Sequence, residues 1–146
     1  ESIFNLKDPT SRDRLVMLRE GVHMIKDHPV LGIGPNMVKP LYAQYREPDA
    51  VNATNPHLHN VPVQIAAERG VPALVVWLWF VVGLIVRLWT MMYDRHQKLL
   101  AATGLAAVVA MFAAGMFEYN FGDSEFLMLF LILVTLPFAA SQPRRI

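Results

Sequence analysis

The sequence has no cysteine among its 146 residues, and only 17% of its residues are charged. Without cysteine, the chain has no disulfide framework, no thiolate metal site and no cysteine nucleophile. Its formal net charge of +1 gives no reason to expect nucleic-acid binding. In an ordinary soluble domain about 25% of the residues are charged, so this deficit argues against a soluble globular enzyme.

Long apolar runs are what the sequence has in excess, and they lie after residue 70. Hydrophobic residues make up 54% of the chain, and the mean hydropathy is +0.33. Three stretches predict membrane-spanning helices at 71–93, 99–117 and 126–142, because a span needs about 20 residues. The third stretch is short and reaches that length only with its flanking residues. Core helices of a soluble bundle would instead show a polar stripe at the helical period, and 99–117 has none.

The charges of the connecting segments predict the orientation of these helices. Basic residues lie in the 94–98 link and in the 143–146 tail, whereas the 118–125 link has three acidic residues and no basic one. The positive-inside rule puts the first two segments in the cytoplasm, and therefore puts 118–125 and 1–70 on the outer side. Because the chain begins at Glu1 without an initiator Met or a signal peptide, we expect it to be the C-terminal part of a longer polypeptide. The fold class that we predict is an all-α integral membrane protein, with three transmembrane helices and a helical outer loop region, within a larger multispanning bundle.

The outer segment begins with a predicted amphipathic helix over residues 11–27. Thr10 followed by Asp13 resembles a capping box at its start. With about 100° of rotation per residue, one broad arc of this helix is apolar, and the opposite arc is polar except for Val16. The apolar arc, which we expect to face the core, consists of Leu15, Met17, Leu18, Gly21, Val22, Met24 and Ile25. Arg14 falls near the middle of this arc.

Arg14 has two interpretations, because a guanidinium directed at an apolar core is costly unless it meets an anion. The first is structural: a salt bridge, or a side chain that snorkels to water at the helix start. The second is an anion clamp, for which a phosphate is a natural ligand because it accepts two parallel bonds from the planar guanidinium. The helical spacing does not decide between them.

A turn-rich stretch ends this helix at His28-Pro29 and continues through Gly32-Ile33-Gly34-Pro35. It is not a dinucleotide fingerprint, because it lacks a third glycine and a preceding strand. A second short helix is predicted at 36–46, disturbed by Pro40, and a loop at 47–56.

The next helix is predicted over residues 61–69. Asn60 is a good N-cap, Pro62 is tolerated in the first turn, and Gly70 ends the helix. His59 therefore lies at a helix N-terminus, where backbone N–H groups and the helix dipole favour anions. The same field disfavours an imidazolium, so it favours the neutral ring that a general base requires.

His57 and His59 together have three interpretations. They can be a metal-binding pair, although the cysteines and clustered carboxylates of a zinc site are missing nearby. They can be structural, with a ring bonded to the backbone. The third interpretation is a base beside a bound anion. The spacing of the two residues leaves all three open.

Several motifs occur in a fixed order along the chain. They are Arg14-Leu-x-Met-x-x-x-Gly21, then Met24-Ile-x-Asp27-His-Pro29-x-x-Gly32-x-Gly34-Pro35, then His59-Asn60 with Gly70 after nine residues, and Phe117-Glu118-Tyr-Asn120-Phe-Gly-Asp123-Ser-Glu125 between two spans. Their order and the helix topology resemble the O-antigen ligase and polymerase family, over nearly the whole chain.

This resemblance implies a multispanning transferase of the bacterial inner membrane, with its active site facing the periplasm and with no metal or other cofactor. The donor would be a glycan linked to undecaprenyl diphosphate. The acceptor would be a sugar of the lipid A core for a ligase, or the end of another lipid-linked glycan for a polymerase. His59 would match the family's catalytic histidine, and Arg14 one of the arginines that hold the diphosphate. A further arginine is expected upstream of this chain.

In the mechanism that we expect, Arg14 binds the donor diphosphate with help from Arg12, Arg19 and the helix start at Asn60, and His59 takes a proton from the acceptor hydroxyl. The supporting residues that we expect to orient His59 or to bind the acceptor are His57, Glu118, Asp123 and Glu125. The alternative for these acids is a solvated loop. The rival functions are a non-catalytic export or scaffold protein of the membrane, and a metalloenzyme built on the two histidines.

Overall fold

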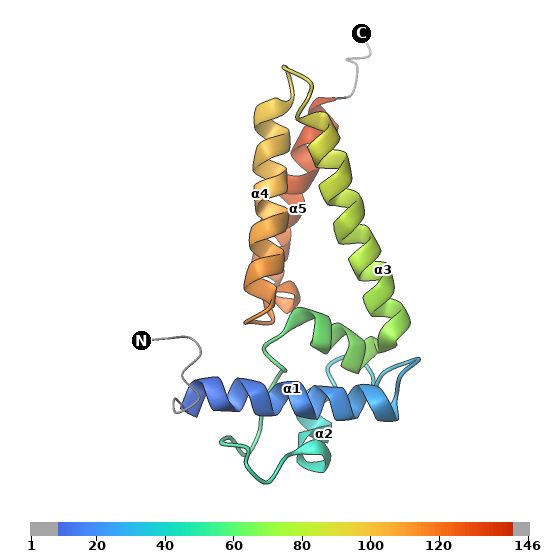
Figure 1. The fold of residues 1–146 in the computed structure, drawn as a ribbon, viewed down its shortest axis with the longest axis vertical. Coiled ribbons are helices and arrows are strands. Elements are labelled where there is room, and N and C mark those ends of the chain that lie inside the picture. Colours follow the sequence, from blue (N-terminus) through green and yellow to red (C-terminus); the bar gives the residue numbers. More distant parts are fainter. Residues whose placement is uncertain (1–8, 142–146) are drawn as a thin grey trace. The chain divides into compact units, whose positions relative to one another are not determined.

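The structure is a computed structural model that describes residues 9–141. All of its regular elements are helical, and no strand occurs within these residues (Figure 1). The elements are α1 (Pro9–Asp27), α2 (Val38–Tyr45), α3 (Val61–Met91), α4 (Lys98–Gly115), the 3-10 helix η1 (Asn120–Gly122) and α5 (Ser124–Ala140). The chain divides into two compact units. The first unit runs to Val75 and includes Met116–Tyr119, and the second consists of Val76–Gly115 and the residues from Asn120 onward.

Helix α1 begins earlier than predicted, so Thr10 lies within the helix and not at the N-cap position predicted for it. The first residue of α1 is Pro9, which suits a position whose N–H has no partner within the helix. The carboxylate of Asp13 accepts hydrogen bonds from Asn52 Nδ2 (2.7 Å) and from the Val51 N–H (3.3 Å). Asp13 therefore binds α1 to the loop that follows α2.

The face of α1 that packs inward is also not the predicted one. Leu15 and Val22, placed on the inward arc from the sequence, are 46% and 43% exposed. Val16, the apparent exception, is fully buried. The buried positions are Asp13, Val16, Met17, Glu20, Gly21 and Met24. The inward face is thus turned by about 100°, the step of one residue, because Asp13 and Glu20 are buried with backbone hydrogen bonds that an apolar pattern does not reveal.

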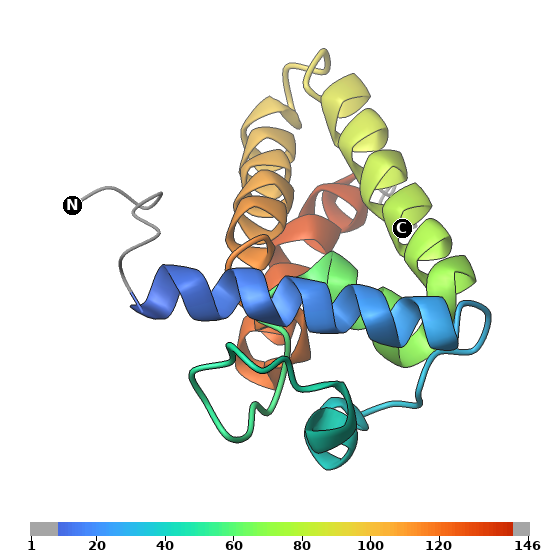
Figure 2. The ribbon, with the colours of Figure 1, turned by 60° about the horizontal axis from the view of Figure 1, so that its bottom comes forward.

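The core of the first unit joins α1, α2 and the first turns of α3. Its buried apolar residues are Met17, Met24, Val38, Leu58 and Ala67. Figure 2 shows α1 in front of the short helical segment that opens α3. The predicted helix at 36–46 is present over Val38–Tyr45, and it contains Pro40 in its first turn, where proline is tolerated.

The glycine-containing turn after α1 packs against the end of the 61–69 segment. The N–H of Ile33 donates to Ala67 O (2.8 Å), and the N–H of Gly34 donates to Glu68 O (3.0 Å). These bonds satisfy carbonyls that a helix C-terminus leaves without partners. The turn is thus a structural cap.

Gly70 separates the two parts of α3, as predicted. Its φ of 82° interrupts the helix, and such a conformation is easy only for glycine. A Cβ at this position would lie 2.0 Å from Val30 O. The N–H of Val71, the next residue, donates to Pro29 O (2.8 Å), so the start of the second part is bonded to the same turn.

The second unit consists of apolar helices. By length and composition, α3 and α4 are able to cross a membrane, and α5 is a shorter apolar helix. The small residues of α4 allow close packing, since a Cβ on Gly104 would lie 3.1 Å from Leu88 Cδ2 and 3.3 Å from Leu133 O. The all-α class is confirmed for residues 9–141, whereas the third span and the orientation stay predictions.

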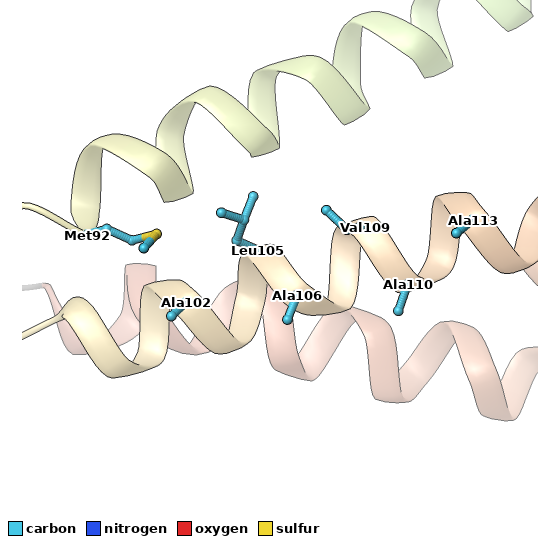
Figure 3. A pocket seen from close by; sticks show the side chains of 7 residues that line it. All are labelled: Met92, Ala102, Leu105, Ala106, Val109, Ala110 and Ala113. Carbon is cyan, nitrogen blue, oxygen red and sulfur yellow. The ribbon is translucent and has the colours of Figure 1, made fainter.

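Helix α4 also lines an open groove of about 420 Å³ (Figure 3). The side chains that line it are Met92, Ala102, Leu105, Ala106, Val109, Ala110 and Ala113. Because all of these side chains are apolar, the groove offers no group for acid, base or anion chemistry.

Candidate active site

Two histidines and one glutamate meet in the first unit. His59 Nδ1 lies 2.9 Å from Glu118 Oε1 and 3.0 Å from Glu118 Oε2. His57 Nε2 lies 3.7 Å from Glu118 Oε1, and the two imidazole rings are 4.2 Å apart between centroids. Of the three predicted acids between the apolar helices, Glu118 is thus the one bonded to His59. The two histidine side chains are 27% exposed and that of Glu118 is 52% exposed, so solvent reaches the cluster.

Asn60 brings these groups together. Its Oδ1 accepts from the Val63 N–H (3.0 Å), which makes it the predicted N-cap of α3. Its Nδ2 donates to Met116 O (3.0 Å). Because Glu118 follows Met116 by two residues, one side chain fixes both the helix behind His59 and the segment that carries the carboxylate.

Gln64 and Glu68, which are not among the residues predicted from the sequence, position residues 57–59, here called the histidine segment. The N–H of Leu58 donates to Gln64 Oε1 (2.8 Å), and Gln64 Nε2 donates to Glu68 Oε1 (2.8 Å). Both residues are buried, with 1% of their surface exposed. Since Leu58 lies between the two histidines, this network orders the backbone of both. The signal in the sequence was the four-residue spacing of a glutamine and a glutamate on one helix.

His59 has an uncommon backbone conformation. Its φ is 48°, in the left-handed region that a non-glycine residue adopts at some energetic cost. Such strain persists where the surroundings hold the residue in place, and it is concentrated at functional sites. The surroundings here are the hydrogen bonds of Leu58 and Asn60 on either side.

The pKa values of His57 and Glu118 are both lowered, but for different physical reasons. For His57, burial is the largest influence and lowers the pKa, His59 lowers it further, and Glu118 opposes them. The lowered pKa favours the neutral form of His57. For Glu118, desolvation alone raises the pKa, but the hydrogen bonds from His59 and Tyr119 N–H and the two histidines together bring it below its ordinary value.

These charges define the tautomer of His59. An ionised carboxylate only accepts hydrogen bonds, so Nδ1 of His59 carries the proton that faces Glu118. When the ring is neutral, its lone pair is on Nε2. An imidazole held in this way by a carboxylate is suited to act as a base, since the carboxylate stabilises the imidazolium that forms.

Arg14 is half-buried on α1, and within residues 12–141 it has no acidic partner at salt-bridge distance. It lies seven residues before Gly21, which puts the two on the same helix face about 10.5 Å apart along the axis. A Cβ on Gly21 would lie 2.5 Å from Val63 Cγ1 and 2.9 Å from Leu58 Cδ1. Gly21, on the same face of α1 as Arg14, therefore packs against the side chains of Leu58 and Val63.

The family model described as O-antigen ligase matches residues 1–78, more than half of the chain. The matched part includes α1, the turn after it, both histidines and the N-cap of α3. The chain belongs to the O-antigen ligase family. This confirms the resemblance drawn from the motifs. Among curated proteins, a comparison finds no match.

The other arginines expected near the diphosphate of an O-antigen ligase lie elsewhere on α1. Arg19 Nη2 is 2.8 Å from Asp49 Oδ2, and Arg12 Nη2 is 3.9 Å from the same oxygen. Along the helix, Arg12 and Arg19 are about 140–160° away from Arg14. The structure therefore does not bring the three arginines together, and Arg19 already has an anionic partner.

The helix start at Asn60 is also a poorer anion site than the sequence suggested. Of the three first N–H positions, Pro62 has none and that of Val63 is bound to Asn60 Oδ1, which leaves only Val61. Both polar atoms of the Asn60 side chain are occupied. In the structure, these contacts make Asn60 a positioning residue.

The two remaining acids belong to the start of α5. Asp123 Oδ1 accepts from the N–H groups of Glu125 (2.9 Å) and Phe126 (3.4 Å), which makes Asp123 the N-cap. Glu125 lies in the first turn of α5, where a negative charge is favourable. Both residues thus have local roles in helix capping.

Proposed function

We propose that this chain carries the catalytic histidine of an O-antigen ligase, which transfers a glycan from undecaprenyl diphosphate to a sugar hydroxyl of the lipid A core. The observation that carries the proposal is the His59–Glu118 pair, with distances of 2.9 and 3.0 Å, inside a chain of the O-antigen ligase family. The transfer needs neither a nucleotide nor a metal.

In the proposed step, His59 Nε2 takes the proton of the acceptor hydroxyl while the hydroxyl oxygen attacks the anomeric carbon of the donor. The bond between that carbon and the diphosphate oxygen breaks, and undecaprenyl diphosphate leaves with the electron pair. Direct displacement inverts the anomeric centre. Glu118 holds the ring and stabilises the imidazolium, and general base catalysis of this kind typically contributes ~10²–10⁴-fold.

Arg14 is the residue proposed to bind the donor diphosphate. It is the arginine of α1 on the same face as Gly21, which packs against Leu58, and a fixed cation stabilises a leaving diphosphate without any proton transfer. Arg12 and Arg19 are not proposed to bind the diphosphate, because both lie near the carboxylate of Asp49.

The membrane arrangement of the proposal has three spans: the second part of α3, α4 and α5. The histidine cluster then faces the periplasm, and the 94–98 link and the C-terminus face the cytoplasm, in agreement with the charge distribution. The membrane is the bacterial inner membrane, where lipid-linked glycans are available on the outer leaflet.

The deciding experiment compares His59→Ala with His96→Ala in the intact protein, reconstituted in liposomes with a lipid-linked glycan donor. We expect transfer to fall by ~10²–10⁴-fold in His59→Ala and to stay at the wild-type level in His96→Ala, which removes a histidine outside the cluster. Normal transfer by a folded His59→Ala protein refutes the base assignment. Offering lipid A core and a second lipid-linked glycan as separate acceptors distinguishes a ligase from a polymerase.

A further inference from the structure

We propose that His57, His59 and Glu118 form a binding site for one divalent transition-metal ion of the zinc type, and that this ion inhibits the transferase. The ligand atoms of the three residues all lie within 4.8 Å of one another. Two imidazoles and one carboxylate are a known ligand set for zinc, with a water completing the coordination.

The spacing of the donor atoms fits a tetrahedral ion. Two ligand atoms bound at about 2.0–2.1 Å with a tetrahedral angle are separated by roughly 3.3–3.4 Å. The separations of the Glu118 oxygens from His59 Nδ1 and His57 Nε2 are 2.9 Å and 3.7 Å. Because these values lie on either side of the ideal one, small rotations of the side chains are enough to admit the ion.

The cluster is also held in place without an ion. The hydrogen bonds of Leu58 to Gln64 and of Asn60 to Met116 position the two histidines and the glutamate from different segments. A site that is ordered before binding loses less conformational entropy when the ion binds. The partial exposure of the three side chains leaves an entry path and room for a water ligand.

The type of ion follows from the ligands. Imidazole nitrogens suit zinc, copper and nickel, whereas magnesium and calcium prefer oxygen ligands. Two of the three donors here are imidazoles, so a hard cation does not compete well for the site.

Inhibition follows from the nitrogen that the ion would take, and this part rests on the proposed function. The nitrogen of His59 that faces the cluster is Nδ1. An ion bound there needs its lone pair, so the single ring proton is then on Nε2. Nε2 can no longer accept the proton of the acceptor hydroxyl, and the base is blocked.

Direct binding tests the site without reference to activity. The intact protein, freed of metal with a chelator, is titrated with ZnCl₂ by calorimetry and with Co²⁺ by visible absorption. We expect one ion per chain, and at least about tenfold weaker binding in both His57→Ala and Glu118→Gln, since even loss of an outer-shell partner costs 10–100-fold at zinc sites, roughly.

His23→Ala is the matched control. His23 Nδ1 lies 3.3 Å from Glu47 Oε1, so it forms a histidine–glutamate pair of the same kind but without a second histidine. Binding by His23→Ala should equal that of the wild type. Circular dichroism verifies that each variant is folded. If His57→Ala does not fold, Glu118→Gln alone provides the test of the site. Absence of binding in the wild type, or equal binding in a folded cluster variant, overturns the site.

The inhibition is read separately. Transfer by the wild type should fall as zinc occupies the site and recover when a chelator is added. Zinc that binds as expected but leaves transfer unchanged overturns the inhibition. Failure of the proposed function has a different signature, which is normal transfer by His59→Ala in the absence of metal.

Discussion

Replacing Asn60 tests whether this residue positions the catalytic pair. Its Oδ1 caps α3 through the Val63 N–H, and its Nδ2 binds Met116 O, two residues before Glu118. Asn60→Ser keeps an oxygen for the cap but loses the donor to Met116. Asn60→Ala loses both interactions. The two variants therefore separate the stability of the helix from the position of the glutamate.

The expected magnitudes follow from these two hydrogen bonds. Loss of an N-cap costs about 1 kcal/mol, and loss of one further hydrogen bond costs about 0.5–1.5 kcal/mol. Asn60→Ala should therefore lower the free energy of unfolding by roughly 1.5–2.5 kcal/mol, and Asn60→Ser by about 0.5–1.5 kcal/mol. A loss of about 1 kcal/mol in the tether lowers the equilibrium constant between molecules with Glu118 in place and molecules without it by about fivefold.

The assay is glycan transfer in liposomes, with kcat and the donor KM measured separately. We expect kcat to fall in Asn60→Ser, by at most about fivefold because the populated fraction cannot change more than this equilibrium constant does, with the donor KM unchanged. Asn55→Ser is the control, because Asn55 Nδ2 donates a hydrogen bond of similar length, 3.0 Å, to Tyr42. A wild-type kcat in Asn60→Ser refutes the positioning role. An effect confined to the donor KM would instead indicate direct contact with the diphosphate.

Three further predictions concern a charge, a buried acid and a helix contact. Arg14→Lys keeps the charge but loses the planar fork, so the donor KM should rise; an unchanged KM excludes bidentate binding. Burial, its largest influence, raises the pKa of Glu20, so stability due to this residue is present in acid and lost as the pH rises through the folded-state pKa. In thermal unfolding, Glu20→Gln should therefore stabilise the protein at pH 7 and have little effect at pH 4, and equal destabilisation at both refutes this. Gly104→Leu should destabilise by about 1–3 kcal/mol through overpacking against Leu88, whereas Gly83→Leu, at a position with no neighbour within 4 Å, should be neutral.

Features that depend on neighbouring residues in the chain were predictable from the sequence. The apolar helices, the N-cap at Asn60 and the break at Gly70 follow from composition, side-chain chemistry and the conformational freedom of glycine. The family was also predictable, because its motifs have a fixed order along the chain. Each of these signals is local, so it does not depend on how distant segments pack.

The inward face of α1 and the partner of His59 were decided only by tertiary structure. Hydrophobic periodicity placed Leu15 inside, whereas hydrogen bonds to a distant loop allow Asp13 to be buried in place of an apolar residue. Likewise, the sequence offered three acids to orient His59, and the bond from Asn60 to Met116 brings Glu118 to it. A contact across nearly sixty residues leaves no trace in local spacing, because it depends on where the intervening helices place the backbone.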